Sequence, residues 1–437
     1  MKTIRLIFSL SLVLLCVFEV SAQRHNYGHR KQKPTIYMVE FEQIDTISCP
    51  MKQTIAHNNF VAQSVRDDFA ATLREGFQQT HNPQFIFATK NNRFALGIGG
   101  EKMLRTSYDS KGAVDNIDFI PYDIPMDVTY ANRQRVMMDA STSRLYLKAV
   151  VHSNTLGRVV VFSDMDFRGG EEFSYIPRLR SAYVSFKGLT IGRDVTTFCD
   201  LDAAPKTIDF QGPNAYNFNF ATMIRYEMDF LNNHMKFGVA AEMPNVSGTY
   251  GQTFMSVPQR VPDFPLYLQY MWGKHRQSHI RASAVLRNMY LYNDARKTTT
   301  DLFGWGAQLS GNIHITKMIQ LFMNGVYGEG ITPYIQDLTG AGLDFTPNPA
   351  DPTRIQTMPM WGWQAAAQVN ILPNLFVSGG FSMVQVQHKN GYYADNQYRR
   401  GQYIFGNVFY SLSPRFKIAA EYLWASRKNM NSDENHA

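Results

Sequence analysis

The sequence is poor in the features that define several common classes of protein. Only three of the 437 residues are cysteine (Cys16, Cys49 and Cys199), which is too few for a disulfide framework. After residue 18 no apolar stretch reaches the roughly 20 residues of a transmembrane helix. The glycine strings Gly97–Gly100 and Gly340–Leu343 lack the lysine and spacing of a phosphate-binding loop. No nucleophile motif accompanies the histidines, so we expect no enzyme, and no cofactor or metal site.

A concentrated basic surface is also missing. The chain has 43 lysine and arginine residues against 36 acidic ones, a formal charge of +7, but these charges are spread along its whole length. Nucleic-acid binding usually gathers basic residues on one helix or one face. We therefore expect no nucleic-acid partner.

The first 22 residues have the pattern of a secretory signal peptide. Lys2 and Arg5 precede an apolar run from Leu6 to Phe18, and Ser21-Ala22-Gln23 fits a cleavage site. Cleavage after Ala22 would leave 41 basic and 35 acidic residues, a charge of about +6. The pattern predicts export from the cytoplasm.

Residues 23–83 form a second region, a basic tail followed by a helical pattern from His57 to Gln79. Five apolar residues recur there every four positions and give one stripe: Val61, Val65, Phe69, Leu73 and Phe77. The stripe is compatible with a periplasmic oligomerisation segment and with a helix packed on or in the domain that follows. The sequence leaves that choice open.

From about Phe85 the apolar residues alternate with polar ones, as in half-buried strands. Ile280, Ala282, Ala284 and Leu286, for example, alternate with Arg281, Ser283, Val285 and Arg287. Such an exported, strand-rich chain with 23 Tyr, 30 Phe and 5 Trp suits an outer-membrane barrel, because only helices and closed barrels satisfy every backbone group in lipid.

The connections favour a membrane barrel over a soluble sandwich. Tight turns at Leu231–His234, Thr316–Met318, Leu372–Asn374 and Ser413–Arg415 alternate with long polar connections at Pro244–Pro265, Asn288–Leu302, Gly328–Met358 and His388–Gln402. Short periplasmic turns and long extracellular loops give this rhythm. Residues 84–437 are therefore predicted to form an all-β, transmembrane antiparallel barrel.

The pattern yields fifteen strand cores between Phe94 and Trp424. Bacterial single-chain barrels have even strand numbers. The polar string from Ser426 to Ala437 stands where a closing strand is expected. We therefore predict about 16 strands, the last of them absent from this sequence, and a complete gene that continues with about ten alternating residues.

One stretch interrupts the alternation, from Leu189 to Asn217. Loops longer than about 12–15 residues between strands are usually functional or disordered, and this one carries apolar residues that need a packing surface. We expect the segment near 194–216 to fold into the lumen and constrict it. Its charged residues are Arg193, Asp194, Asp200, Asp202, Lys206 and Asp209.

The same stretch resembles a known family. DLDAAPKTIDFQGPN (Asp200–Asn214), after TIGRD (Thr190–Asp194), is similar to the third-loop signature of DcaP-type porins of Gram-negative bacteria. AEYLW (Ala420–Trp424) resembles that family's next-to-last strand, and the likeness runs from Phe85 to Ala437. It implies a homotrimeric 16-stranded porin in outer-membrane lipid, with the loop as constriction and a preference for small anions such as dicarboxylates. The N-terminal segment departs from the family in lacking a clear coiled coil.

The polar faces of the predicted strands should line the pore. Their charged residues are Arg144, Lys148, Asp164, Asp166, Arg225, Glu227, Lys236, Glu242, Arg281 and Arg287. Six basic residues against four acidic ones tilt the wall toward anions. Arg178 and Arg180 share the parity of lipid-facing residues, which would place them at or beyond a strand end. A plugged or adhesive barrel, whose long loops bind a partner, is the alternative to an open channel.

Overall fold

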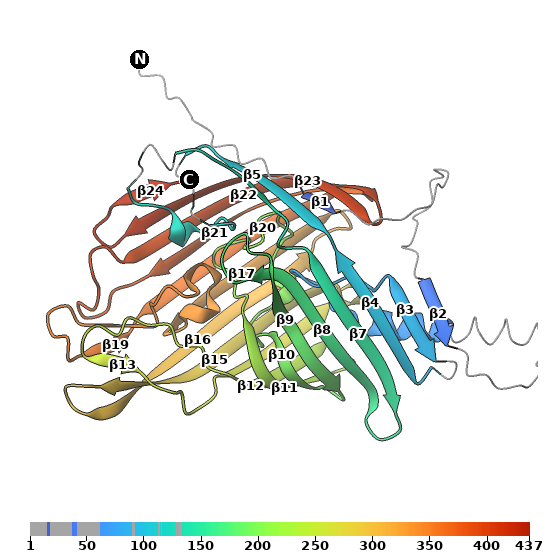
Figure 1. Ribbon diagram of the computed structural model, residues 1–437, viewed down its shortest axis with the longest axis horizontal. Coiled ribbons are helices and arrows are strands. Elements are labelled where there is room, and N and C mark those ends of the chain that lie inside the picture. The colour runs from blue at the N-terminus through green and yellow to red at the C-terminus, as the bar shows by residue number, and fades with distance from the viewer. Residues whose placement is uncertain are drawn as a thin grey trace, which may run out of the picture.

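The computed structural model describes residues 62–89, 92–111, 114, 116–127, 129 and 133–437, and the backbone of two short strands, β1 (Leu15–Val17) and β2 (Tyr37–Phe41). The described chain is almost entirely β. Its strands form one large sheet that curls into a barrel, with strands tilted across the wall (Figure 1). The predicted all-β antiparallel barrel is confirmed.

Neighbouring strands of the wall follow one another in chain order, and each pairs antiparallel with the next. These strands are β3 (Phe85–Thr89), β4 (Phe94–Glu101), β7 (Arg144–Ser153), β8 (Gly157–Gly169), β9 (Ile176–Phe186), β10 (Leu189–Val195), β11 (Phe220–Phe230), β12 (Met235–Glu242), β14 (Phe264–Trp272), β15 (Ser278–Asn293), β16 (Thr298–His314), β17 (Ile319–Glu329), β20 (Pro359–Leu372), β21 (Leu375–Val386), β22 (Tyr398–Ser413) and β23 (Phe416–Asn429).

Two wall strands continue past a short break. β5 (Met103–Asp109) prolongs β4 and pairs with β6 (Arg135–Asp139), which prolongs β7. With these pairs merged, the described residues give fifteen long strands from β4 to β23, the number that the alternation predicts.

Shorter elements lie in the loops. The short strands are β13 (Phe254–Ser256), β18 (Phe345–Pro347), β19 (Ile355–Thr357) and β24 (Glu434–His436). The 3-10 turns are η1 (Pro121–Asp123), η3 (Leu201–Ala203), η4 (Lys274–Arg276), η5 (Thr332–Tyr334) and η6 (Gln336–Leu338).

The two ends of the wall meet at a seam between β5 and β23. β1 pairs with both, because Cys16 lies opposite Leu104 of β5 and Ile418 of β23. β24 pairs with the loop end of β23, so the polar string after Ser426 is partly strand. That the gene continues, and that the segment containing β1 is cleaved as a signal, both stay predictions.

One end of the barrel carries tight turns and the other carries longer loops (Figure 1). The connections at 187–188, 231–234, 373–374 and 414–415 are tight, whereas those at 110–134, 196–219, 243–263 and 330–358 are long. The prediction of a long loop at Asn288–Leu302 is wrong. β15 and β16 extend through Asn288–Leu302 and turn only at 294–297, because their alternation continues beyond the membrane thickness.

Side chains alternate across the wall as predicted. On β15, Ile280 and Leu286 are 41% and 45% exposed, whereas Arg281 and Arg287 are buried. Successive residues of a strand point to opposite faces, so the exposed apolar set covers the outside of the barrel. Such an apolar outer surface is suited to contact with lipid.

A short helix, residues 62–71, packs on the inner face of the wall. Val65 and Phe69 are buried against Ile86, Ala95 and Val150 of β3, β4 and β7. The helix ends at residue 71, short of the predicted Gln79, and Gly76 with its φ of +110° could not belong to an α-helix. Residues 57–61 lie outside the described chain. Within the described residues no helix is long and apolar enough to span a membrane.

Candidate functional site: the lumen and its inward loop

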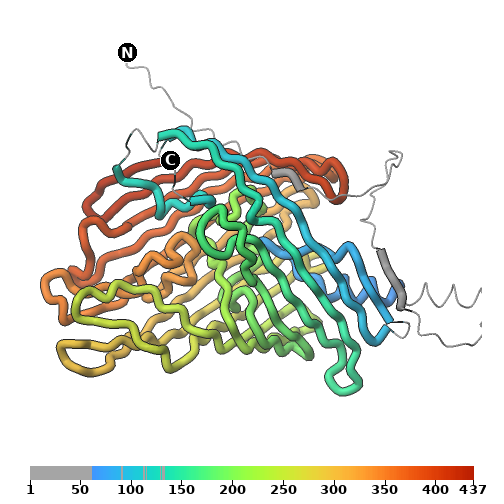
Figure 2. Tube along the Cα trace, viewed as in Figure 1, coloured from blue at the N-terminus to red at the C-terminus, as the bar shows by residue number. Residues whose placement is uncertain are grey.

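The connection between β10 and β11, residues 196–219 (here loop 3), folds into the lumen. Phe198, Ile208, Tyr216 and Asn217 are each fully buried. A surface loop cannot bury such residues, so the predicted inward fold is confirmed. In Figure 2 this segment, drawn in green, curls back toward the strands near the middle of the view instead of projecting from the end of the barrel.

Two buried glutamates from distant strands hold the backbone of loop 3. Glu242 of β12 accepts hydrogen bonds from Thr196 Oγ1 and Thr197 N, both at 2.7 Å. Glu421 of β23 accepts from Ile208 N at 3.0 Å and Asp209 N at 2.7 Å. Hydrogen bonds to a charged acceptor are stronger than neutral ones. The loop is therefore fixed at its start and at its middle.

Further wall residues complete this attachment. Asp200 accepts hydrogen bonds from His279 at 2.8 Å and Ser310 at 2.6 Å. Asn324, Gln364 and Asn407 donate to carbonyls of loop 3, at Ala215, Ala203 and Lys206 respectively. The loop thus runs along the arc of wall from β12 to β23 and leaves the arc from β4 to β9 facing it.

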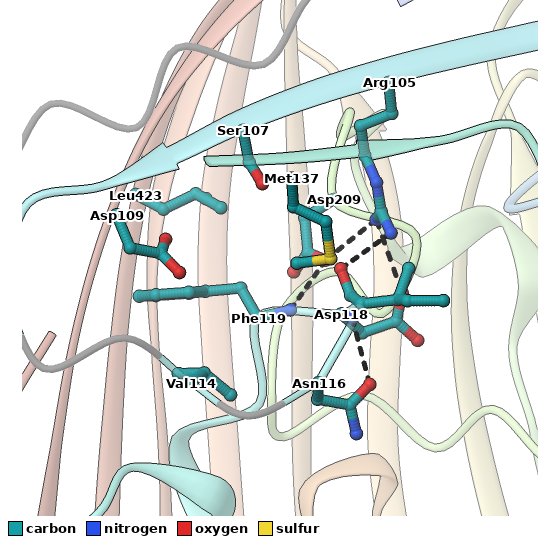
Figure 3. A pocket seen from close by; sticks show the side chains of 11 residues that line it. Arg105, Ser107, Asp109, Val114, Asn116, Asp118, Phe119, Met137, Asp209 and Leu423 are labelled. Carbon is teal, nitrogen blue, oxygen red and sulfur yellow. Dashed lines mark hydrogen bonds and ion pairs between the residues drawn. The ribbon is translucent and has the colours of Figure 1, made fainter. Parts of the chain in front are cut away.

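Two extracellular loops close over loop 3. Phe119 N donates to Asp209 Oδ1 at 3.2 Å beside the Arg105–Asp118 ion pair of 3.3 Å (Figure 3). From the loop at 330–358, Asp337 N donates to Asn214 O of loop 3 at 3.1 Å, and the Asp337 carboxylate accepts hydrogen bonds from Tyr398 and from Tyr122 N. Asp209, the loop residue at this junction, is therefore an anchor rather than an exposed pore residue. Its burial and the nearby Asp118 carboxylate raise its pKa to about 7.

The facing arc carries a ladder of arginines. On its inner side Arg144 pairs with Asp164, and Arg178 and Arg180 bind Asp166 at 2.6 and 3.1 Å. Nearer loop 3, Arg225 binds Asp194 at 2.7 Å and Glu227 at 3.4 Å, and Lys236 binds Glu227 at 3.3 Å. The wall charges are paired with one another, so the acidic loop is not their main partner.

The expected orientation of Arg178 and Arg180 is wrong. Asp164 pairs with Ser181 and the next residue, Met165, pairs with Leu179, so Arg180 is the extra residue of a β-bulge in β9. Such an extra residue reverses the parity of the strand beyond it. Arg180 consequently points into the lumen and is 2% exposed.

Most of the predicted constriction residues lie in loop 3, and two do not. Arg193 and Asp194 belong to β10, and Arg193 shares its face with the exposed Thr222, so it leaves the lumen face; this prediction is corrected. Asp194 points inward to Arg225. Asp200 and Asp209 are buried anchors, whereas Asp202 and Lys206 line a cavity.

All ten predicted pore-lining residues lie on the inner face of their strands. They are Arg144, Lys148, Asp164, Asp166, Arg225, Glu227, Lys236, Glu242, Arg281 and Arg287. Several serve as structural partners. Lys148 donates to Thr72 O at 2.8 Å at the end of the 62–71 helix, and Arg281 donates to Thr197 O at 2.6 Å. Arg287 binds Asp263 at 3.0 Å and Asp344 at 3.2 Å.

A cavity of about 910 Å³ opens at the short-turn end of the lumen. Its charged lining comprises Arg74, Arg144, Lys206, Arg276, Arg415 and Lys417 against Glu75, Glu101, Asp202 and Asp209, with His81, His275, His279 and His314 beside them. We call this cavity the vestibule. Arg74 and Arg144 are paired with the wall carboxylates of Asp194 and Asp164, Glu101 lies 3.8 Å from Arg144, and Asp209 is buried. Outside these groups the lining holds Lys206, Arg276, Arg415 and Lys417 against Glu75 and Asp202, which gives the vestibule a positive potential at neutral pH.

Several residues of the site were missed from the sequence. Arg74 comes from the region of the predicted helix but lies outside its apolar stripe, so the stripe did not single it out. Arg105 and Glu421 sit on strands whose alternation does mark an inward face, so that signal was available for both. Cys199 is buried as a free thiol, and Cys49 lies outside the described residues.

Comparison with models of protein families matches residues 126–437 to a porin subfamily, which is more than half of the chain. The chain belongs to this porin subfamily. The outer membrane channel DcaP of Acinetobacter baumannii has a similar structure, with a TM-score of 0.68 and 18% identity over 78% of this chain and 94% of that one. An anion-selective porin from Comamonas acidovorans gives a TM-score of 0.48 and 13% identity, over 77% and 89% of the two chains.

No curated protein sequence matched the chain. The DcaP-type resemblance inferred from loop 3 is confirmed by the family match and the shared fold. The porin is thus an outer-membrane β-barrel channel, and the geometry above is that of its lumen.

Proposed function

We propose that this porin is a passive diffusion channel for small hydrophilic solutes, with a preference for anions such as dicarboxylates. It is exported by a cleaved signal peptide to the outer membrane of a Gram-negative bacterium and works there as a homotrimer. The observation that carries the anion preference is the basic excess of the vestibule, through which every solute must pass. The trimer follows from the family resemblance, and the mass of the detergent-solubilised protein tests it.

Loop 3 forms the constriction in this proposal, with Arg193 excepted because of its outward face. The lumen-facing residues named above set the field along the wall. Walls of low dielectric constant focus such a field, so a small imbalance of charge changes the local concentration of permeating ions. Basic groups at the mouth therefore favour anions even where the deeper arginines are paired.

A planar-bilayer recording of the full-length protein under a salt gradient tests the proposal. Lys206 is exposed into the vestibule and Lys417 lines it. Reversing both charges, Lys206→Glu with Lys417→Glu, should lower the anion-to-cation permeability ratio on the order of three- to tenfold, since a change of about one kT in potential changes ion concentration e-fold.

Lys297→Glu is the matched control, because Lys297 lies exposed at the opposite end, on the β15–β16 hairpin. It should leave the ratio as in the wild type. An unchanged ratio in the double variant would show that the vestibule does not select ions.

A further inference from the structure

Residues 74–79 cross the lumen between loop 3 and the arginine ladder. On the side of loop 3, Phe77 N donates to Leu201 O at 2.7 Å and Gln78 Nε2 donates to Phe210 O at 2.5 Å. On the side of the wall, Arg74 pairs with Asp194 and stacks on Tyr183. The segment therefore fills the gap that loop 3 leaves open opposite β7 to β10.

The segment fits this place closely. Gly76 has a φ of +110°, and a Cβ there would lie 2.5 Å from Leu201 O. Only glycine adopts this conformation without strain and also permits the approach. Phe77 is buried in an aromatic socket, with ring centroids 5.1 Å from Tyr216 and 5.3 Å from Phe218.

Gln78 occupies the space in front of two guanidinium groups. Arg144 Nη1 donates to its backbone oxygen at 2.5 Å, and Arg180 Nη2 donates to its Oε1 at 2.6 Å. The residue is held with a φ of +53°, in the left-handed region that costs a non-glycine residue free energy. Two oxygens presented to two arginines reproduce the way in which a carboxylate is bound.

We infer that residues 74–79 form a displaceable plug, in which Gln78 occupies an Arg144–Arg180 site that takes the carboxylate of a permeating anion. This inference rests on the proposed anion channel and adds that Gln78 of the chain itself competes with the permeating anion for the two arginines. A carboxylate adds a Coulomb attraction to the two guanidinium groups that the neutral oxygens of Gln78 lack. A carboxylate that reaches the site therefore competes with Gln78, and the strained backbone at Gln78 assists its release.

Planar-bilayer recordings of the full-length porin test the plug. Gly76→Ala places a methyl group against Leu201 O and should lift the segment away from loop 3. Gln78→Ala removes the side-chain contact to Arg180 and leaves the backbone in place. Both variants should raise the unit conductance, Gly76→Ala about twofold or more, because the narrowest part of a pore limits its conductance.

Gly157→Ala is the matched control, because Gly157 has a φ of +73° in a tight turn with no atom within 4 Å of a Cβ. It carries the same backbone strain outside the lumen and should conduct as the wild type. When a carboxylate displaces the plug, the wild-type channel should enter a state of larger conductance. Succinate, compared with chloride at equal ionic strength, should therefore lengthen this state in the wild type. In Gly76→Ala succinate should have no such effect.

The outcomes separate the plug from the channel. Raised conductance in the two lumen variants alone, with the succinate effect, supports the plug. Equal conductance in all four proteins, or no response of the wild type to succinate, overturns it while the porin stands. Absence of conductance steps from every variant, with heat-modifiable migration showing a folded barrel, overturns the diffusion channel itself.

Discussion

The clearest consequence of the lumen geometry concerns Glu421. Its carboxylate accepts three hydrogen bonds, from Ile208 N, Asp209 N and Asn407 Nδ2 at 2.7 to 3.0 Å, and its side chain is 3% exposed. Each hydrogen bond to a charged group contributes about 1.5–3 kcal/mol. Water from the adjacent vestibule can partly replace the two backbone bonds when the carboxylate is removed. We therefore expect Glu421→Ala to weaken the attachment of loop 3 by about 3 kcal/mol.

Hydrogen exchange measured at single amides checks this value. A loss of about 3 kcal/mol corresponds to roughly hundredfold faster exchange at Ile208 and Asp209, if exchange proceeds by local opening of the loop. Glu421→Gln offers one oxygen in place of two and should fall between the alanine variant and the wild type.

Glu434→Ala is the control, because Glu434 is an exposed glutamate on β24, beside β23. It should leave both amides protected. Exchange in Glu421→Ala within about threefold of the wild type would refute the claim that this carboxylate holds the loop.

Two further predictions concern the vestibule and the helix. Burial and the neighbouring Asp200 carboxylate raise the pKa of Asp202 to about 6. Lowering the pH from about 7 to 5 therefore neutralises an acidic group of the vestibule and should raise the anion-to-cation permeability ratio. The part of this rise that Asp202→Asn removes, seen in reversal potentials, measures the contribution of Asp202. Lys148→Met removes the donor to Thr72 O and Phe69 O and should destabilise the end of the 62–71 helix by about 1–3 kcal/mol. The loss should be visible as faster proteolysis near residue 72. Unchanged cleavage there would contradict the role of Lys148.

Much of this architecture follows from local sequence. A period of two separates the inner and outer faces of β12 or β15 without tertiary information, and the break in that period marks loop 3. The apolar residues of the loop also require a packing surface, which in a barrel of this kind is the lumen. These inferences succeed because each depends on a single strand or a single loop.

The remainder depends on contacts between distant segments. The parity of Arg180 is set by a bulge that depends on how β8 pairs with β9, and no residue type marks its position. The stripe from Val61 to Phe77 reads as one helix, yet Phe77 packs in the aromatic socket of loop 3 instead. Gly76 is the local sign that the helix ends early, and its meaning is clear only beside Leu201.

The hydrogen bonds between Glu421 and loop 3 also have a consequence for how the barrel folds. Asp209 and Glu421 lie 212 positions apart in the chain, so their contact forms only when the strands between them have been laid down. Contacts of such long range form late in folding, because a large loop must close first. In a folding intermediate that lacks β23, loop 3 would be mobile. The protection of loop 3 from hydrogen exchange would therefore show whether the C-terminal strand of the barrel has formed.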